Sequence, residues 1–128
     1  MVPGVQVDVQ TAELYSRVPD NLKTKTSGRL EGPSVDVNGN LLCTDMGAGR
    51  IYRISPEKRW EVLVEYDGIP NGCKLHKDGR AFIADRKNGL MVLDTGTGRI
   101  ETVLSGPKAG VRFKGLNDLH FALNGDFY

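Results

Sequence analysis

EGPSVDVNGNLLCTDMGAGRIYRI, residues 31–54, has a second copy in residues 71–94, NGCKLHKDGRAFIADRKNGLMVLD. When the two stretches are aligned on the turn glycines Gly39 and Gly79, an aspartate follows six residues later in both and a further glycine ten residues later. A third turn glycine, Gly125, stands 46 residues after Gly79, whereas the first two are 40 residues apart. The chain therefore contains an internal repeat with a period of 40 to 46 residues.

Each repeat is predicted to be a four-stranded antiparallel meander. The turn dipeptides Asn-Gly, Asp-Gly and Asn-Gly predict two-residue hairpins of type I′ between the first two strands of each unit. The strand segments are short, rich in apolar residues, and bounded by turn residues. They are expected at residues 33–37, 41–44, 51–54 and 61–66, and again at 74–77, 81–84, 90–93 and 101–104. Four strands per unit at this period indicate an all-β protein of the β-propeller class.

A complete propeller has about 4–8 blades, so this chain is expected to form only part of one. We expect complete blades at residues 31–68 and 71–106 and an incomplete blade at 117–128. Residues 1–30 form an N-terminal segment. Within it, residues 12–18 could be helix or strand. Their sequence resembles that of the predicted fourth strand of the first repeat, which favours a strand. In a complete ring this strand would belong to the last blade and close the circle. Without that blade, the segment is expected to be mobile or paired elsewhere.

The overall composition excludes several kinds of protein. The 17 basic and 16 acidic residues give a net charge of +1, which offers no electrostatic basis for binding nucleic acid or an anionic membrane. No apolar run approaches the roughly 18 residues of a membrane span, and the N-terminal MVPGVQVDVQ lacks the features of a signal peptide. Cys43 and Cys73 make neither a disulfide framework nor a metal cluster, so we expect reduced thiols and a cytoplasmic protein.

A polar residue stands eight positions before each turn glycine: Glu31, Asn71 and Asn117. The first strand of a propeller blade lines the central channel, so these side chains are expected to converge near the axis. A carboxylate in a narrow channel is unfavourable unless something pairs with it. Carboxylate and amide oxygens suit a hard cation such as Ca²⁺, which accepts about 6–8 oxygen ligands.

Four segments together resemble the gluconolactonase, regucalcin and senescence-marker-protein family. They are LEGPSVDVNGNLLCTD, GRIYRISPEKRWEVLVEYDGIPNGCKLHKDGRAFIAD, NGLMVLDTGTGRI and KGLNDLHFALNGDFY, and the likeness runs from about residue 12 to the last residue. The resemblance implies a six-bladed propeller that holds one divalent cation in its tunnel and hydrolyses sugar lactones or related cyclic esters. By this likeness the present chain holds about two and a half blades.

The resemblance also implies roles for individual residues. Glu31 and Asn117 match metal ligands of the family, for calcium or another divalent cation (Zn²⁺, Mg²⁺ or Mn²⁺), while Asn71 and Asp118 match the wall of the substrate pocket. The other family ligands and the base that activates water come from later blades, so the catalytic base is expected beyond residue 128. Gly115 stands where some members carry an arginine that meets the substrate, which leaves the lactone unspecified. We expect little activity from residues 1–128 alone.

Structural alternatives remain open for these positions. Glu31 could be a surface residue, Asn117 and Asp118 a strand-entry cap, and Asn71 part of a turn. Other polar residues favour structural roles: Asp45 and Asp85 as anchors of the turn that follows them, His76 and His120 as strand residues, and Lys108, Arg112 and Lys114 as a solvated basic loop. Residues 36–47 resemble the start of an EF-hand loop but lack its glycine at the sixth position and its glutamate at the twelfth.

The rival to an enzyme is a non-catalytic propeller module for binding or assembly, or an inactive truncated product. Such a module would associate with another copy of itself or with a second chain that completes the ring. A second chain with the later ligands would favour a split enzyme whose small-molecule partner is a lactone. Without such a chain, a scaffold would be favoured.

Overall fold

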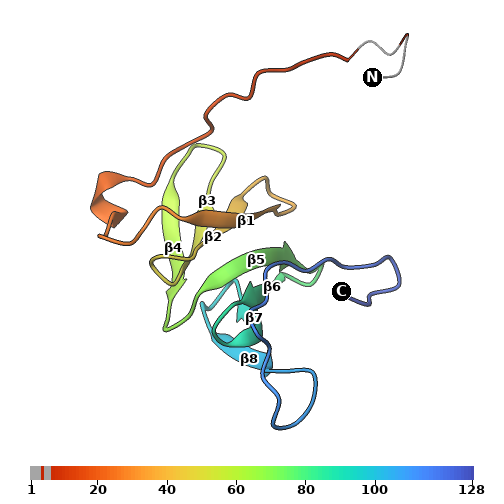
Figure 1. The fold of residues 1–128 in the computed structure, drawn as a ribbon. Helices are drawn as coiled ribbons and strands as arrows, with labels where there is room; N and C mark the ends of the chain where they lie inside the picture. Colours follow the sequence, from red (N-terminus) through yellow and green to blue (C-terminus); the bar gives the residue numbers. More distant parts are fainter. Residues whose placement is uncertain (1–3, 5–6) are drawn as a thin grey trace.

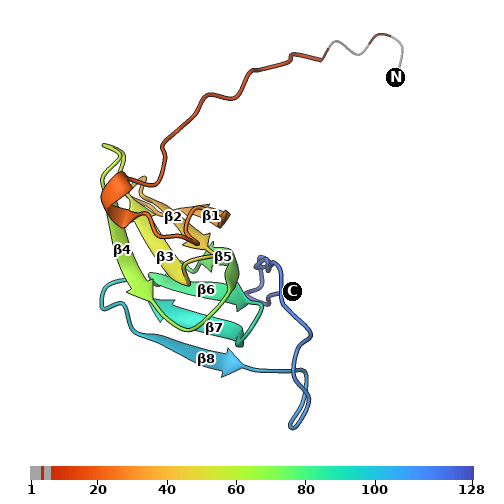
Figure 2. The same ribbon diagram turned by 60° about the vertical axis from the view of Figure 1, so that its left-hand side comes forward.

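The structure of this chain is a computed structural model that describes residue 4 and residues 7–128. Its regular structure consists of two four-stranded antiparallel sheets, each a meander in chain order (Figures 1 and 2). The first contains β1 (Leu30–Val35), β2 (Leu41–Asp45), β3 (Arg50–Ile54) and β4 (Trp60–Glu65). The second contains β5 (Pro70–Leu75), β6 (Arg80–Asp85), β7 (Gly89–Asp94) and β8 (Ile100–Leu104). The predicted all-β class and its pair of meanders are confirmed.

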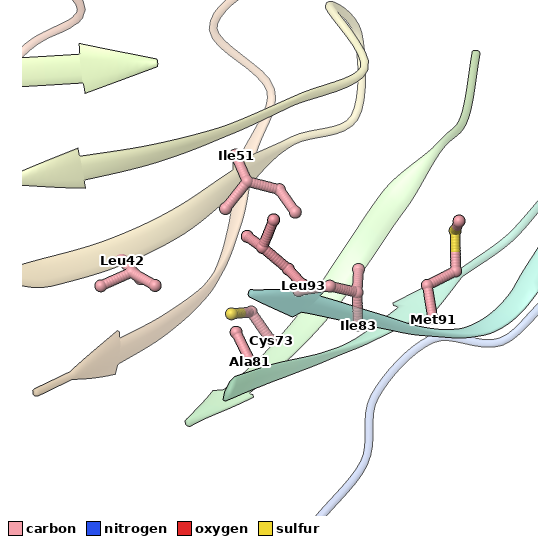
Figure 3. Close-up of a cluster of buried hydrophobic side chains, with 7 residues drawn as sticks. All are labelled: Leu42, Ile51, Cys73, Ala81, Ile83, Met91 and Leu93. Atoms are coloured by element: carbon pink, nitrogen blue, oxygen red, sulfur yellow. The ribbon is translucent and has the colours of Figure 1, made fainter. Parts of the chain in front are cut away.

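The two sheets lie side by side, with β1 next to β5 (Figure 1). Apolar side chains from both sheets fill the space between them and form one buried cluster (Figure 3). Leu42 and Ile51 come from the first sheet, and the second contributes Cys73, Ala81, Ile83, Met91 and Leu93. Because each sheet buries a face against its neighbour, the repeats stabilise one another, as expected for consecutive blades.

The three hairpins share one geometry, and the prediction of type I′ turns is wrong. In the first hairpin, the Asp36 amide donates to the Asn40 carbonyl at 2.9 Å and the Gly39 amide donates to the Asp36 carbonyl at 3.1 Å. Type I′ requires a positive φ at both central residues. Among the described non-glycine residues, however, only Lys58 has one. The loops are three-residue turns that end on a glycine with positive φ, and the same pair of bonds recurs at His76–Arg80 and Ala122–Asp126.

Two fully buried carboxylates, Asp45 and Asp85, anchor equivalent turns of the two sheets. One oxygen of each accepts hydrogen bonds from two backbone amides of the turn that follows, and the other accepts one from an amide that precedes the first strand. The partners are Gly47, Ala48 and Gly28 for Asp45, and Lys87, Asn88 and Ile69 for Asp85. The predicted structural role of both aspartates is confirmed, and the bonds join the segment before the first strand of each sheet to the turn between its second and third strands.

The third repeat is a hairpin that packs on the second sheet. His120 and Tyr128 exchange backbone hydrogen bonds at 3.0 Å, and Phe121 pairs with Phe127. The rings of Phe121 and Phe127 lie against Phe82 of β6, with centroids 5.4 and 6.1 Å away. The hairpin lies beside β5 and β6 in both views (Figures 1 and 2).

Residues 12–18 form no strand in this chain, where the prediction places them in a sheet only in a complete ring. The segment is extended and has no ladder of backbone hydrogen bonds to a neighbouring strand. It is attached instead by side chains: Val18 is buried, and the indole nitrogen of Trp60 donates to Ser16 Oγ at 3.0 Å. Residues 1–3 and 5–6 of the predicted N-terminal segment lie outside the described residues, and a ring-closing role stays a prediction.

The part of the chain that the structure describes has one short 3-10 helix, Asp20–Leu22. None of its helices has the length and apolar character needed to cross a membrane.

The two cysteines are free and buried, which leads to a prediction about their chemistry. Burial raises the pKa of both the Cys43 and Cys73 thiols to about 12, from an ordinary value of 9.0. We expect a thiol reagent at pH 8 to label neither cysteine in the folded chain and both in denaturant. Because the unfolded thiols ionise first, the free energy of unfolding should fall as the pH rises above 9. Rapid labelling without denaturant would contradict this assignment.

Candidate functional site

The four residues predicted from the sequence to form a site line one pocket of about 170 Å³. The pocket lies where the first strands of the two sheets and the start of the third repeat come together. Its lining residues are Glu31, Gly32, Pro33, Asn71, Gly72, Lys74, Asn117 and Asp118. The three repeats therefore contribute to one site, as the repeat spacing predicts.

The first strand of each sheet begins earlier than predicted, so the candidate residues lie within the strands. β1 begins at Leu30 rather than at residue 33, and β5 begins at Pro70 rather than at residue 74. Glu31 and Asn71 are therefore part of the strands, and not of the loops before them. Each lies at an irregularity in the pairing with the next strand, where a bulge changes the direction of a side chain.

Glycines next to the site residues let the repeats approach closely. Gly32 has φ +54°, and a methyl group on its Cα would lie 2.5 Å from both the carbonyl oxygen of Asn71 and the amide nitrogen of Cys73. A methyl group on Gly72 would lie 2.5 Å from Asp118 Oδ1 and 2.7 Å from the Asp118 Cα. A side chain at either position would push neighbouring repeats apart and widen the pocket.

A chain of hydrogen bonds crosses all three repeats at the pocket. Thr44 on β2 donates its hydroxyl hydrogen to the backbone carbonyl of Asn71 at 2.6 Å. Asn71 Nδ2 then donates to Asn117 Oδ1 at 2.5 Å, and the Gly72 amide donates to the Asn117 carbonyl at 2.8 Å. Thr44 is fully buried and Asn71 is 7% exposed, so water competes little for the bond between them.

Glu31, Asn117 and Asp118 are exposed to solvent, which differs from the expectation of a narrow channel. Since Glu31 remains hydrated, the unfavourable burial that the sequence suggested does not arise in this chain. Asp118 is fixed locally, because its Oδ1 accepts a hydrogen bond from the Leu119 amide at 2.8 Å. The pocket thus offers two carboxylates and two amide groups on an accessible surface.

Oxygen atoms dominate the chemistry of the pocket. The described residues hold no cluster of three or more His, Cys, Asp or Glu side chains that could bind a metal. The available donors are the carboxylates of Glu31 and Asp118 and the Asn117 amide oxygen, which accepts one hydrogen bond and has a second lone pair. This set fits a hard cation such as Ca²⁺ or Mg²⁺ better than one that requires imidazole or thiolate.

Sequence reasoning missed two neighbours of the candidate residues. Lys74 is the one positively charged residue that lines the pocket, although the sequence placed it simply in a predicted strand. Thr44 lies outside the pocket and acts through its contact with Asn71. The position of Lys74 could have indicated its place in the pocket, because it follows Gly72 by two residues and so lies on the same face of the strand. No local signal identifies Thr44, because its partner is 27 residues away.

The other polar residues considered in the sequence lie outside the pocket lining. His76 precedes the second hairpin, and its Nδ1 lies 2.9 Å from Asp78 Oδ1. His120 is exposed on the third hairpin, and the basic residues Lys108, Arg112 and Lys114 are exposed in the preceding loop. Nothing in their placement adds a second group of ligands.

Comparison with known proteins identifies the fold and the family. Residues 30–128 match the family model described as SMP-30/Gluconolactonase/LRE-like region. Diisopropyl-fluorophosphatase of Loligo vulgaris is 32% identical over 103 residues, which cover 75% of this chain and 31% of that protein. Lactonase drp35 of Staphylococcus aureus is 36% identical over 63 residues, which cover 47% of this chain and 19% of the relative.

A solved structure of a gluconolactonase from Xanthomonas campestris, XC5397, superposes with a TM-score of 0.70 at 20% identity. The match covers 80% of this chain and 34% of that structure, and it supports the assignment of a partial propeller. This chain thus spans about a third or less of the relatives described here. The repeat, the fold and the family match over residues 30–128 together show that the chain belongs to the SMP-30/gluconolactonase/LRE-like family.

Proposed function

We propose that this chain forms part of a divalent-cation-dependent hydrolase of lactones or related cyclic esters. The observation that carries the proposal is the convergence of Glu31, Asn71, Asn117 and Asp118 from three consecutive repeats on one pocket. Family membership supports the reaction class, since relatives are named as lactonases and as a diisopropyl-fluorophosphatase. Both names describe a hydrolysis in which water attacks an electrophilic centre, a carbonyl carbon in one case and a phosphorus atom in the other.

Glu31 and Asn117 would hold the cation through a carboxylate oxygen and an amide oxygen. A cation bound there would polarise the ester carbonyl of the substrate. Asn71 and Asp118 would line the space that the lactone enters, and Lys74 would offset part of the negative charge of the two carboxylates. The group that activates water is expected from a later repeat, so these residues bind and orient the substrate rather than transfer a proton.

Calcium titration and lactone hydrolysis, measured on this chain and on a version completed to six repeats, test the proposal. We expect weak binding and little hydrolysis for residues 1–128, and clear binding and turnover for the complete ring. Replacing Glu31 with glutamine in the complete ring should weaken cation binding by about tenfold or more, because a charged ligand is lost. The matched control is Glu57→Gln, since Glu57 is exposed and lies outside the pocket lining. A complete ring that binds no divalent cation would exclude the proposed function.

A further inference from the structure

We infer that Asn71 is a positioning residue that fixes the amide oxygen of Asn117 toward the pocket. The inference rests on the proposed cation site and adds Asn71 to it as a residue that acts through Asn117. Asn71 comes from the second repeat and Asn117 from the third, 46 positions later, so no local structure holds their side chains together.

The contact is direct and sheltered. Asn71 Nδ2 lies 2.5 Å from Asn117 Oδ1, and the Asn71 side chain is almost completely buried while that of Asn117 is exposed. An exposed asparagine alone would exchange among rotamers and present oxygen and nitrogen in turn. The Asn71 Nδ2 donor favours the rotamer of Asn117 that presents Oδ1 to it, because the flipped rotamer would place the Asn117 NH₂ group against the Asn71 NH₂ group. The selected oxygen keeps one lone pair for a ligand in the pocket.

The backbone at Asn71 is itself held in place by the two neighbouring repeats, which sets where the side chain begins. Its carbonyl accepts the Thr44 hydroxyl at 2.6 Å, and the amide of the next residue, Gly72, donates to the Asn117 carbonyl at 2.8 Å. The Asn71–Gly72 dipeptide therefore donates hydrogen bonds to both the backbone and the side chain of Asn117. A second residue that orients a metal ligand in this way commonly changes metal affinity by about 10–100-fold when it is removed.

The test uses Mn²⁺ as the probe and residues 1–128 as the protein. Bound Mn²⁺ broadens NMR signals of nearby groups, so the side-chain amide signals of Asn117 report binding at this pocket even when affinity is low. The variant is Asn71→Leu, which keeps the approximate volume and removes the donor. The matched control is Ser34→Ala, which removes a hydrogen bond between the first two repeats, from the Leu75 amide to Ser34 Oγ, and leaves the Asn71–Asn117 contact intact.

We expect Asn71→Leu to weaken Mn²⁺ binding by about tenfold and Ser34→Ala to change it less than twofold. An Asn71→Leu variant with wild-type affinity would overturn the inference, as would an equal loss in Ser34→Ala, which would indicate a purely structural role. If the variant fails to fold, the wild-type chain decides: one Nδ2 proton of Asn71 should be protected from exchange and close to Asn117, and its absence overturns the inference. If Mn²⁺ broadens no Asn117 signal in the wild type, the cation site fails, and the inference fails with it.

Discussion

Replacing Gly72 with alanine is expected to separate the third repeat from the second and to lower the free energy of unfolding by about 2–3 kcal/mol. The added methyl group would lie 2.5–2.9 Å from Asp118 Oδ1, the Asp118 Cα and the Asn117 carbonyl oxygen. Two of these three atoms belong to the backbone, so rotation of a side chain cannot relieve the overlap. The strand must move, and the hydrogen bond from the Gly72 amide to Asn117 breaks with it.

Thermal and denaturant unfolding measure the loss of stability, and NMR of the third repeat measures the displacement. The matched control is Gly96→Ala, because a methyl group there would meet only Asp94 Oδ1 at 3.3 Å. We expect that control to change stability by less than about 0.5 kcal/mol, as most surface substitutions do. If Gly72→Ala were as stable as the wild type, with unshifted signals for residues 117–128, the close approach of the two repeats would be excluded.

Replacing Asp85 with alanine is expected to lower the free energy of unfolding by about 4 kcal/mol, because three backbone amides and a tyrosine hydroxyl would lose their buried charged acceptor. The carboxylate is fully buried and accepts hydrogen bonds from the amides of Lys87, Asn88 and Ile69 at 2.7–3.0 Å. It also accepts the Tyr66 hydroxyl at 2.8 Å. Burial and the Asp85 carboxylate raise the pKa of Tyr66, so this hydroxyl stays a donor throughout the usual pH range.

The control for this prediction is Asp94→Ala. Asp94 binds the amides of Gly96 and Thr97 in the same manner but is exposed, so water can replace its carboxylate. Urea unfolding of the two variants, followed by tryptophan fluorescence, should show a much larger loss of stability for Asp85→Ala. Similar losses of stability in both variants would mean that burial of Asp85 does not strengthen its hydrogen bonds to the turn.

The fold was predictable from the sequence because its main signals are local. Gly39, Gly79 and Gly125 each end a hairpin, and Asp45 and Asp85 each anchor a turn within three residues of themselves. Such contacts recur at a fixed spacing and so reveal the repeat. The turn type was mispredicted because Asn-Gly and Asp-Gly pairs suit both a two-residue loop and a three-residue loop that ends on glycine.

The convergence of the candidate residues on one pocket was predictable, but the strand starts and the contacts between repeats were not. Repeat spacing brought Glu31, Asn71 and Asn117 to one position, and the pocket contains all three. The strand starts were missed because bulges at Glu31 and Pro70 depend on pairing with the next strand. The contacts of Thr44 and Gly72 with other repeats join residues 27 and 45 or more positions apart, which no short pattern encodes.

In the first two repeats, the residue that faces the pocket and the residue that allows close packing are adjacent but separate: Glu31 and then Gly32, Asn71 and then Gly72. The glycine preserves the architecture whatever precedes it. During evolution, residues of different charge can therefore be exchanged one blade at a time, so the chemistry of the pocket can change while the packing of the blades is kept.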